Sequence, residues 1–88
     1  MNHSNEDISK IISIINDKIL SHHQLDNEDY DIISIKNTSK TNVSIETFET
    51  LIKLTTYLRA NNIEYSISYQ YKENKFGIHH IDVSVVKN

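Results

Sequence analysis

Cysteine, proline and tryptophan are absent from this chain of 88 residues, and glycine, alanine, arginine and methionine each occur once. The absence of cysteine excludes a disulfide framework, a thiol nucleophile and a cysteine-based zinc site. No apolar run approaches the length that crosses a membrane. The polar and acidic start, with Glu6 and Asp7, lacks the positive charge of a signal peptide. These absences predict a cytoplasmic protein with no membrane segment.

Basic charge is also scarce. The formal net charge is −3 and the isoelectric point is about 5.9, with Arg59 as the single arginine. Proteins that bind nucleic acid usually present a basic face, so this balance argues against nucleic acid as a partner. The chain is rich in Ile, Asn and Lys, whose codons are AT-rich. That bias is typical of phages, plasmids and low-GC bacteria.

The hydrophobic content of 38% is enough for one modest core, and the length predicts a single domain over residues 1–88. The first segment predicts a helix from about Asn5 to Ser21, with Ser4 as its N-cap. Its isoleucines follow helical spacing at positions 8, 11, 12, 15 and 19. His22 and His23 would then lie at the C-terminal end of that helix, where the helix dipole favours a cation.

The middle of the chain predicts a short strand over Tyr30–Lys36, apolar on both faces, and then a turn over 37–42. Val43 and Ile45 favour a short return strand; the alternative is that Ser44 starts the next helix. That second helix has Thr47 as a plausible N-cap and Asn61-Asn62 as a left-handed end. Its expected core face consists of Phe48, Leu51, Ile52, Thr55 and Leu58.

The C-terminal part predicts a hairpin of strands 63–71 and 75–86. Apolar residues occupy odd positions from Ile63 to Tyr71, then even positions at Phe76 and Ile78, and odd positions again from Ile81. The parity changes at His79-His80. A bulge near Gly77 would place Phe76 and Ile78 in the core. Without a bulge they would form an exposed apolar patch, or a partner would cover that end of the sheet.

The predicted fold class is therefore α+β. We expect an antiparallel-rich sheet of three to four strands carrying two helices on one face, in the order α-β-(β)-α-β-β.

Several residue patterns could carry chemistry, and each has a simpler explanation. His80, Asp82 and Ser84 lie in file on one strand, about 6.5–7 Å apart, and do not converge as a catalytic triad must. The five histidines lack the spacing of metal ligands, so we expect no metal site, no cofactor and no enzymatic activity.

The acidic segment Asp26–Asp31 predicts a solvated loop or a partner contact. The Tyr65, Tyr69 and Tyr71 stripe predicts core packing, with Tyr71 and Tyr69 the most exposed; stacking on bases is the alternative.

We therefore expect a small acidic protein-binding module, an inhibitor or adaptor of the phage or mobile-element type that blocks a surface of a protein partner. Host-defence nuclease complexes are one class of such partners. The expected contact residues are Asp26, Glu28, Asp29, Tyr69, Tyr71, Phe76, Ile78 and His79. The alternative is a homodimeric regulator associated with nucleic acid, which predicts a cluster of Lys36, Lys40, Lys72 and Lys75.

Overall fold

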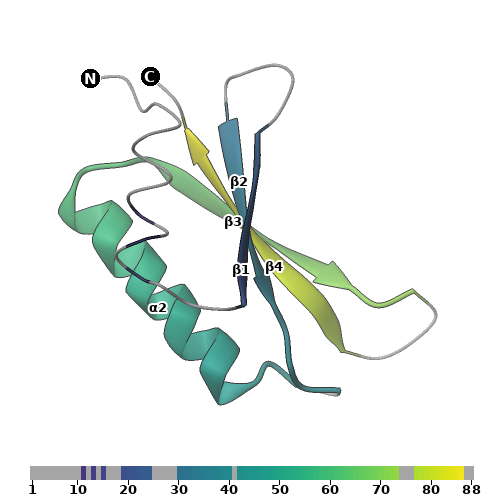
Figure 1. Ribbon diagram of the computed structural model, residues 1–88. Coiled ribbons are helices and arrows are strands. Elements are labelled where there is room, and N and C mark those ends of the chain that lie inside the picture. Colours follow the sequence, from purple (N-terminus) through teal and green to yellow (C-terminus); the bar gives the residue numbers. More distant parts are fainter. Residues whose placement is uncertain are drawn as a thin grey trace.

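The computed structural model describes Ile11, Ser13, Ile15 and the ranges 19–24, 30–40, 42–73 and 77–86, with the backbone alone described at 22–24. Figure 1 shows the arrangement of the elements. They are β1 (Leu20–Gln24), β2 (Tyr30–Lys36), α2 (Ile45–Ala60), β3 (Tyr65–Tyr71) and β4 (Ile78–Val86).

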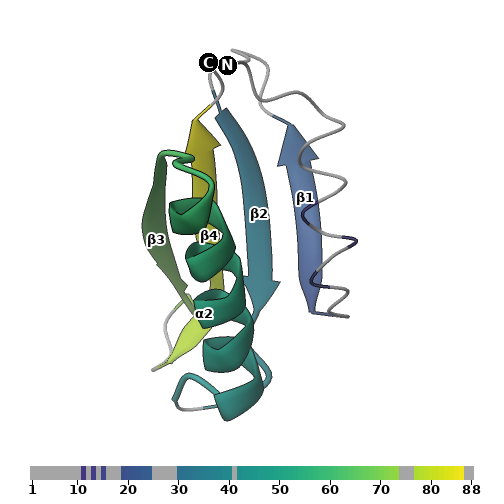
Figure 2. The same cartoon turned by 90° about the vertical axis from the view of Figure 1, so that its left-hand side faces the viewer.

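The four strands form one antiparallel sheet in the order β1-β2-β4-β3. The strands β2 and β4 are central, whereas β1 and β3 are at the edges. Figure 2 shows α2 crossing in front of the sheet on one side. The predicted α+β class with a small antiparallel sheet is therefore confirmed. The described elements contain one helix, not two.

The core lies between α2 and the two central strands. Alternate residues of β2 and β4 point toward the helix and are fully buried, because every second side chain of a strand faces the same side. The buried core residues are Ile11, Ile33, Ile35, Leu51, Leu54, Leu58, Ile81, Val83 and Val85.

The prediction for the first helix is wrong at its C-terminal end. Residues Leu20–Gln24 form β1 and pair with β2, so His22 and His23 lie in a strand and not at a helix end. The physical reason is that β2 has free backbone groups along both edges, and β1 pairs with the edge that β4 leaves open. Ile11, Ser13 and Ile15 are helical, and the rest of the predicted helix before residue 19 lies outside the described residues.

The prediction of a return strand at Val43 and Ile45 is also wrong, and so is Thr47 as the N-cap. Ser44 caps α2: its Oγ accepts a hydrogen bond of 3.1 Å from the Thr47 amide. The Thr47 hydroxyl instead donates to the Lys36 carbonyl at 3.0 Å. The predicted left-handed end is confirmed, because Asn61 is the C-cap and Asn62 has a φ of 56°.

The buried side of α2 differs from the predicted one. Leu51, Thr55 and Leu58 are buried as expected, but Phe48 and Ile52 are 55% and 46% exposed. Their place is taken by Leu54 and by threonines whose hydroxyls bond to helix carbonyls. Thr50 Oγ1 donates to the Glu46 carbonyl and Thr55 Oγ1 to the Leu51 carbonyl, both at 2.9 Å. Satisfied hydroxyls make these threonines acceptable in the core.

The hairpin of β3 and β4 contains the predicted bulge. Gln70 pairs with His80 and the next residue, Tyr71, pairs with Ile78, so His79 is the extra residue. Gly77 precedes it with a φ of 103°, a conformation that favours glycine. The bulge turns Ile78 to the helix side, where it packs against the core. Phe76 lies outside the described residues.

Candidate functional site

Two exposed tyrosines lie on one side of β3. Ile67 and Tyr69 are opposite Val83 and Ile81, whose side chains point toward α2, so they share that side of the sheet. Tyr71 is opposite Ile78 in the same way. Ile67, Tyr69 and Tyr71 are nevertheless 38%, 47% and 71% exposed. We call these three residues the β3 platform.

The β3 platform is open because α2 does not extend over it. Figure 2 shows α2 in front of the central strands, with β3 beyond it at the margin of the sheet. Tyr65, at the start of β3, is half-buried and packs against the core. The exposed side of α2 adds Ile45, Phe48 and Ile52 to the apolar surface. The predicted core packing of the tyrosine stripe is therefore wrong for Tyr69 and Tyr71 and holds for Tyr65 alone, whereas the expectation that Tyr71 and Tyr69 are its most exposed members is confirmed.

A connected polar network lies on the opposite, helix-free side of the sheet. Ser34 Oγ donates to Asp82 Oδ1 at 2.6 Å, and His80 Nε2 is 3.3 Å from the same oxygen. His80 Nδ1 lies 2.6 Å from His79 Nδ1, with the two rings edge-to-face at 4.9 Å between centroids. These atoms form one chain from β2 to the bulge.

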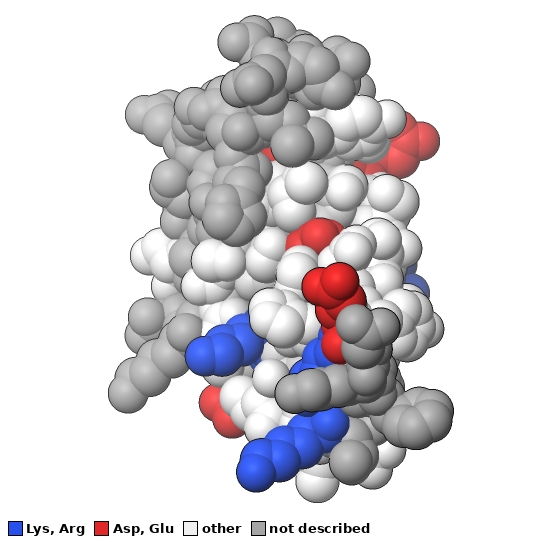
Figure 3. All heavy atoms as spheres, turned by 90° about the vertical axis from the view of Figure 1, so that its right-hand side faces the viewer, with Lys and Arg blue, Asp and Glu red and all other residues white. Residues whose placement is uncertain are grey.

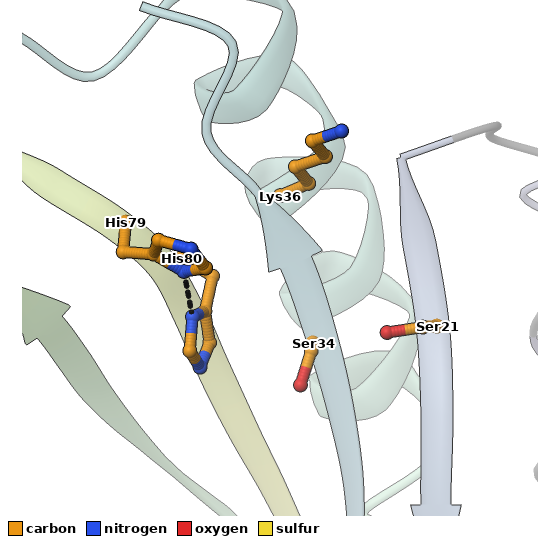
Figure 4. A pocket seen from close by; sticks show the side chains of 5 residues that line it. All are labelled: Ser21, Ser34, Lys36, His79 and His80. Atoms are coloured by element: carbon orange, nitrogen blue, oxygen red, sulfur yellow. Dashed lines mark hydrogen bonds between the residues drawn. The ribbon is translucent and has the colours of Figure 1, made fainter. Parts of the chain in front are cut away.

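This network borders a shallow depression of about 290 Å³ lined by Ser21, Ser34, Lys36, His79 and His80. Figure 4 shows that the five side chains come from three neighbouring strands and that the two histidine rings meet at the hairpin end. Which ring donates in this contact depends on the tautomers of the two imidazoles.

The order of groups in the network decides what it can do chemically. Asp82 stands between Ser34 and His80, so the hydroxyl bonds to a carboxylate and not to an imidazole. A serine nucleophile needs a base in hydrogen-bond contact with its hydroxyl. Ser34 has an acceptor for its proton but no histidine in that role. The hydrogen bonds of this network hold side chains of β2 and β4 together, and the network does not present an activated nucleophile.

On the helix-free side, Figure 3 shows uncharged surface interrupted by separate acidic and basic groups, with acidic groups near the middle of that face. The described lysines Lys36, Lys40 and Lys72 lie toward the hairpin end: Lys72 Nζ donates to the Lys40 carbonyl at 3.0 Å, and Lys36 is opposite His80. Lys75 lies outside the described residues. Within the described part of the chain, no three His, Asp or Glu side chains gather as a metal site would require.

The structure brings together four of the expected contact residues. Tyr69, Tyr71, Ile78 and His79 all lie at the hairpin end, with the tyrosines on the helix side and exposed, and Ile78 mostly against the core. Asp26, Glu28 and Asp29 lie outside the described residues, as does Phe76. Asp31 was expected in a solvated loop, but it is in β2 and fully buried.

The segment 25–29 follows a strand end far from the hairpin. Its described neighbours are Gln24 and Tyr30, and Tyr30 is opposite Val86 at the other end of β4 from Ile78. Eight steps of strand separate these ends, roughly 26 Å at about 3.3 Å per residue.

Ile67 and Ser34 were missed as candidates. Ile67 reads as a core residue because it belongs to a perfect alternation, and the exposed position of β3 becomes evident only from the strand order. The available signal was the complete lack of charge in the segment 65–71. Ser34 bonds to Asp82, which is 48 positions away in the sequence, and no local sequence pattern predicts that pair.

No family model, no curated protein and no solved structure matches this chain. Among the described helical residues, no helix is both long enough and apolar enough to cross a membrane.

Proposed function

We propose that this protein is a small protein-binding module that acts by occupying a surface of a protein partner, as an inhibitor or adaptor of the phage or mobile-element type. The observation that carries the proposal is the β3 platform, in which two tyrosines and an isoleucine remain exposed on an ordered strand. Tyrosines are enriched among the residues that dominate binding energy.

The chemistry of the β3 platform fits a partner with an apolar or aromatic surface. Segment 65–71 carries no charged side chain, so docking there desolvates no ion. A strand holds its side chains in fixed directions, and a tyrosine has few rotatable bonds, so little conformational entropy is lost on binding. The polar ends of Tyr69 and Tyr71 can hydrogen-bond at the rim of the contact.

The experiment is affinity capture from the native host, identification of the partner by mass spectrometry, and measurement of its Kd for single variants. Tyr69→Ser and Tyr71→Ser should each weaken binding at least about fivefold, because a truncated aromatic anchor costs more than about 1 kcal/mol.

Tyr30→Ser is the matched control. Tyr30 is also exposed, but it lies in β2 opposite Val86, on the helix-free side and at the far end of the sheet. It should leave the Kd unchanged. Equal affinity of all three variants would show that the β3 platform is not the contact.

The second candidate is a regulator associated with nucleic acid. The contact between Lys72 and Lys40, with Lys36 opposite His80 at the same end of the sheet, supports it. The net charge of −3 opposes it.

A further inference from the structure

The outer edge of β3 has an unusual lack of protection. Within the described part of the chain β3 pairs with β4 alone, which makes it an edge strand. Edge strands are normally protected from pairing by lysine, proline, inward charges or bulges. The segment Tyr65–Tyr71 has none of these, and the bulge of this hairpin is in β4. Such an edge is a template for a further strand.

The backbone directions of β3 follow from two hydrogen bonds. The Val86 amide donates to the Glu64 carbonyl at 2.9 Å and the Lys72 amide donates to the Gly77 carbonyl at 3.2 Å. Both bonds involve the even-numbered residues that flank β3, Glu64 and Lys72, and both lie on the side of β4. Because antiparallel strands alternate the side to which a residue turns its N–H and C=O, even residues face β4 and odd residues face outward. The free edge therefore presents the backbone groups of Tyr65, Ile67, Tyr69 and Tyr71.

These outward groups are self-complementary under a two-fold axis. If two copies of β3 run antiparallel with the axis at Ser68, Ile67 is opposite Tyr69 of the other copy and Tyr65 is opposite Tyr71. Each of these is a pair of odd residues, so all four outward N–H groups and all four outward C=O groups of each copy find partners. Registers shifted by two residues leave one end of the strand unpaired.

The side chains agree with the same register. On the helix side, aromatic and aliphatic residues lie opposite each other, and such cross-strand pairs are stabilising. On the helix-free side, Ser66 lies opposite Gln70 and Ser68 opposite its own copy. No pair brings like charges together, since the segment has no charge. A symmetric pairing of identical surfaces is also the commonest form of homodimer.

We propose that β3 pairs with β3 of a second copy of this chain, antiparallel and centred on Ser68, to form a continuous eight-stranded sheet. This goes beyond the proposed function and does not compete with it. Pairing uses the backbone in the plane of the sheet, whereas the side chains of the β3 platform stand out of that plane. The dimer would place the two platforms side by side between the two copies of α2.

The test uses the absence of cysteine from the chain. In the proposed register the two Ser68 residues form a non-hydrogen-bonded pair with Cα atoms about 4.5 Å apart, within disulfide range. Ser68→Cys should therefore give a covalent dimer of about twice 10.3 kDa under mild oxidation. Ser66→Cys is the matched control, because its two copies lie about 13 Å apart, too far for a disulfide.

A second variant tests the backbone directly. Ile67→Pro removes an outward N–H that makes no bond to β4, so the monomer should keep its circular dichroism spectrum and light scattering should show loss of the dimer. A wild-type chain that is monomeric at millimolar concentration would overturn the proposal. So would equal crosslinking at positions 66 and 68, or an Ile67→Pro variant that remains dimeric.

The outcomes separate this proposal from the proposed function. Loss of partner capture in Tyr69→Ser and Tyr71→Ser tests the β3 platform when light scattering shows that these variants still dimerise, and crosslinking at Ser68 tests the strand edge alone. Crosslinking without capture would retain the dimer and reject the binding function. Capture by a monomer that does not crosslink would reject the dimer.

Discussion

Asn37 joins several segments of this protein through its side chain. It is buried directly after β2. Its Nδ2 donates to the carbonyls of Ile78 and Asn42 at 2.7 and 2.8 Å, and its Oδ1 accepts from the Ser44 amide at 3.0 Å. Its own amide donates to the His79 carbonyl at 3.2 Å. One side chain therefore connects the bulge of β4 with the start of α2.

Asn37→Ala should lower the free energy of unfolding by about 2–3 kcal/mol, because it leaves several buried backbone groups without partners. Urea unfolding followed by circular dichroism measures this. Asn42→Ala is the matched control: Asn42 is exposed and contributes its backbone to the same cluster, so its loss should stay within about 0.5 kcal/mol. Similar losses in both variants would contradict the role of the Asn37 side chain.

At the scale of an element, α2 divides into a side that holds the fold and a side that faces solvent. Leu54 is fully buried against the sheet, whereas Phe48, earlier in the same helix, is mostly exposed. Burial decides the energetic value of a large apolar side chain, because an exposed one has lost little contact with water on folding. The two residues have similar hydrophobicity but different roles.

Leu54→Ala should cost about 2–5 kcal/mol of unfolding free energy, as expected for a cavity in a packed core. Phe48→Ser should cost less than about 1 kcal/mol. Thermal and urea unfolding of both variants give the comparison. A loss for Phe48→Ser as large as that for Leu54→Ala would mean that this phenylalanine is part of the core.

The sequence predicts strictly periodic elements well and ambiguous ones poorly. The alternation of β3, the bulge at His79 and the left-handed end at Asn62 follow from local rules, and all three are confirmed. The buried side of α2 does not follow from local rules. Threonine is neutral in hydropathy, and its burial in the core depends on a hydrogen bond from its hydroxyl to a helix carbonyl. β1 was missed because its five residues, Leu-Ser-His-His-Gln, show no apolar period.

The candidate site was predicted in part. The features that depend on nearby residues were predicted, and those that depend on strand order were not. The exposure of Tyr69 and Tyr71 follows from their position near the hairpin tip. The network from Ser34 to His80 depends on strand order, which places β4 between β2 and β3. No alternation within one strand can reveal which strand becomes its neighbour.

At the scale of the whole molecule, the protein is elongated, and three of its described lysines lie toward one end. The molecule extends over 40 × 25 × 18 Å. Lys36, Lys40 and Lys72 lie toward the hairpin end, while the chain as a whole carries a net charge of −3. Glu73 directly follows Lys72, so this end of the molecule carries both signs of charge.

We expect nucleic acid to bind only at low salt. Three lysines can release about three counterions, which limits the slope of log K against log salt to about −3. The double variant Lys36→Glu, Lys72→Glu should abolish that binding, as measured by fluorescence anisotropy across a salt series. Binding that persists at physiological ionic strength and survives this variant would favour the second candidate function through a different surface.

The bulge in β4 also has an evolutionary consequence. His79 has no opposite residue on β3, because Gln70 is opposite His80 and the next residue, Tyr71, is opposite Ile78. The difference between this hairpin and a regular one is a single codon. Loss of that codon would keep Ile78 against the core and remove one ring of the histidine pair, so a change in chain length, with no substitution, is enough to redesign the surface at this end of the sheet.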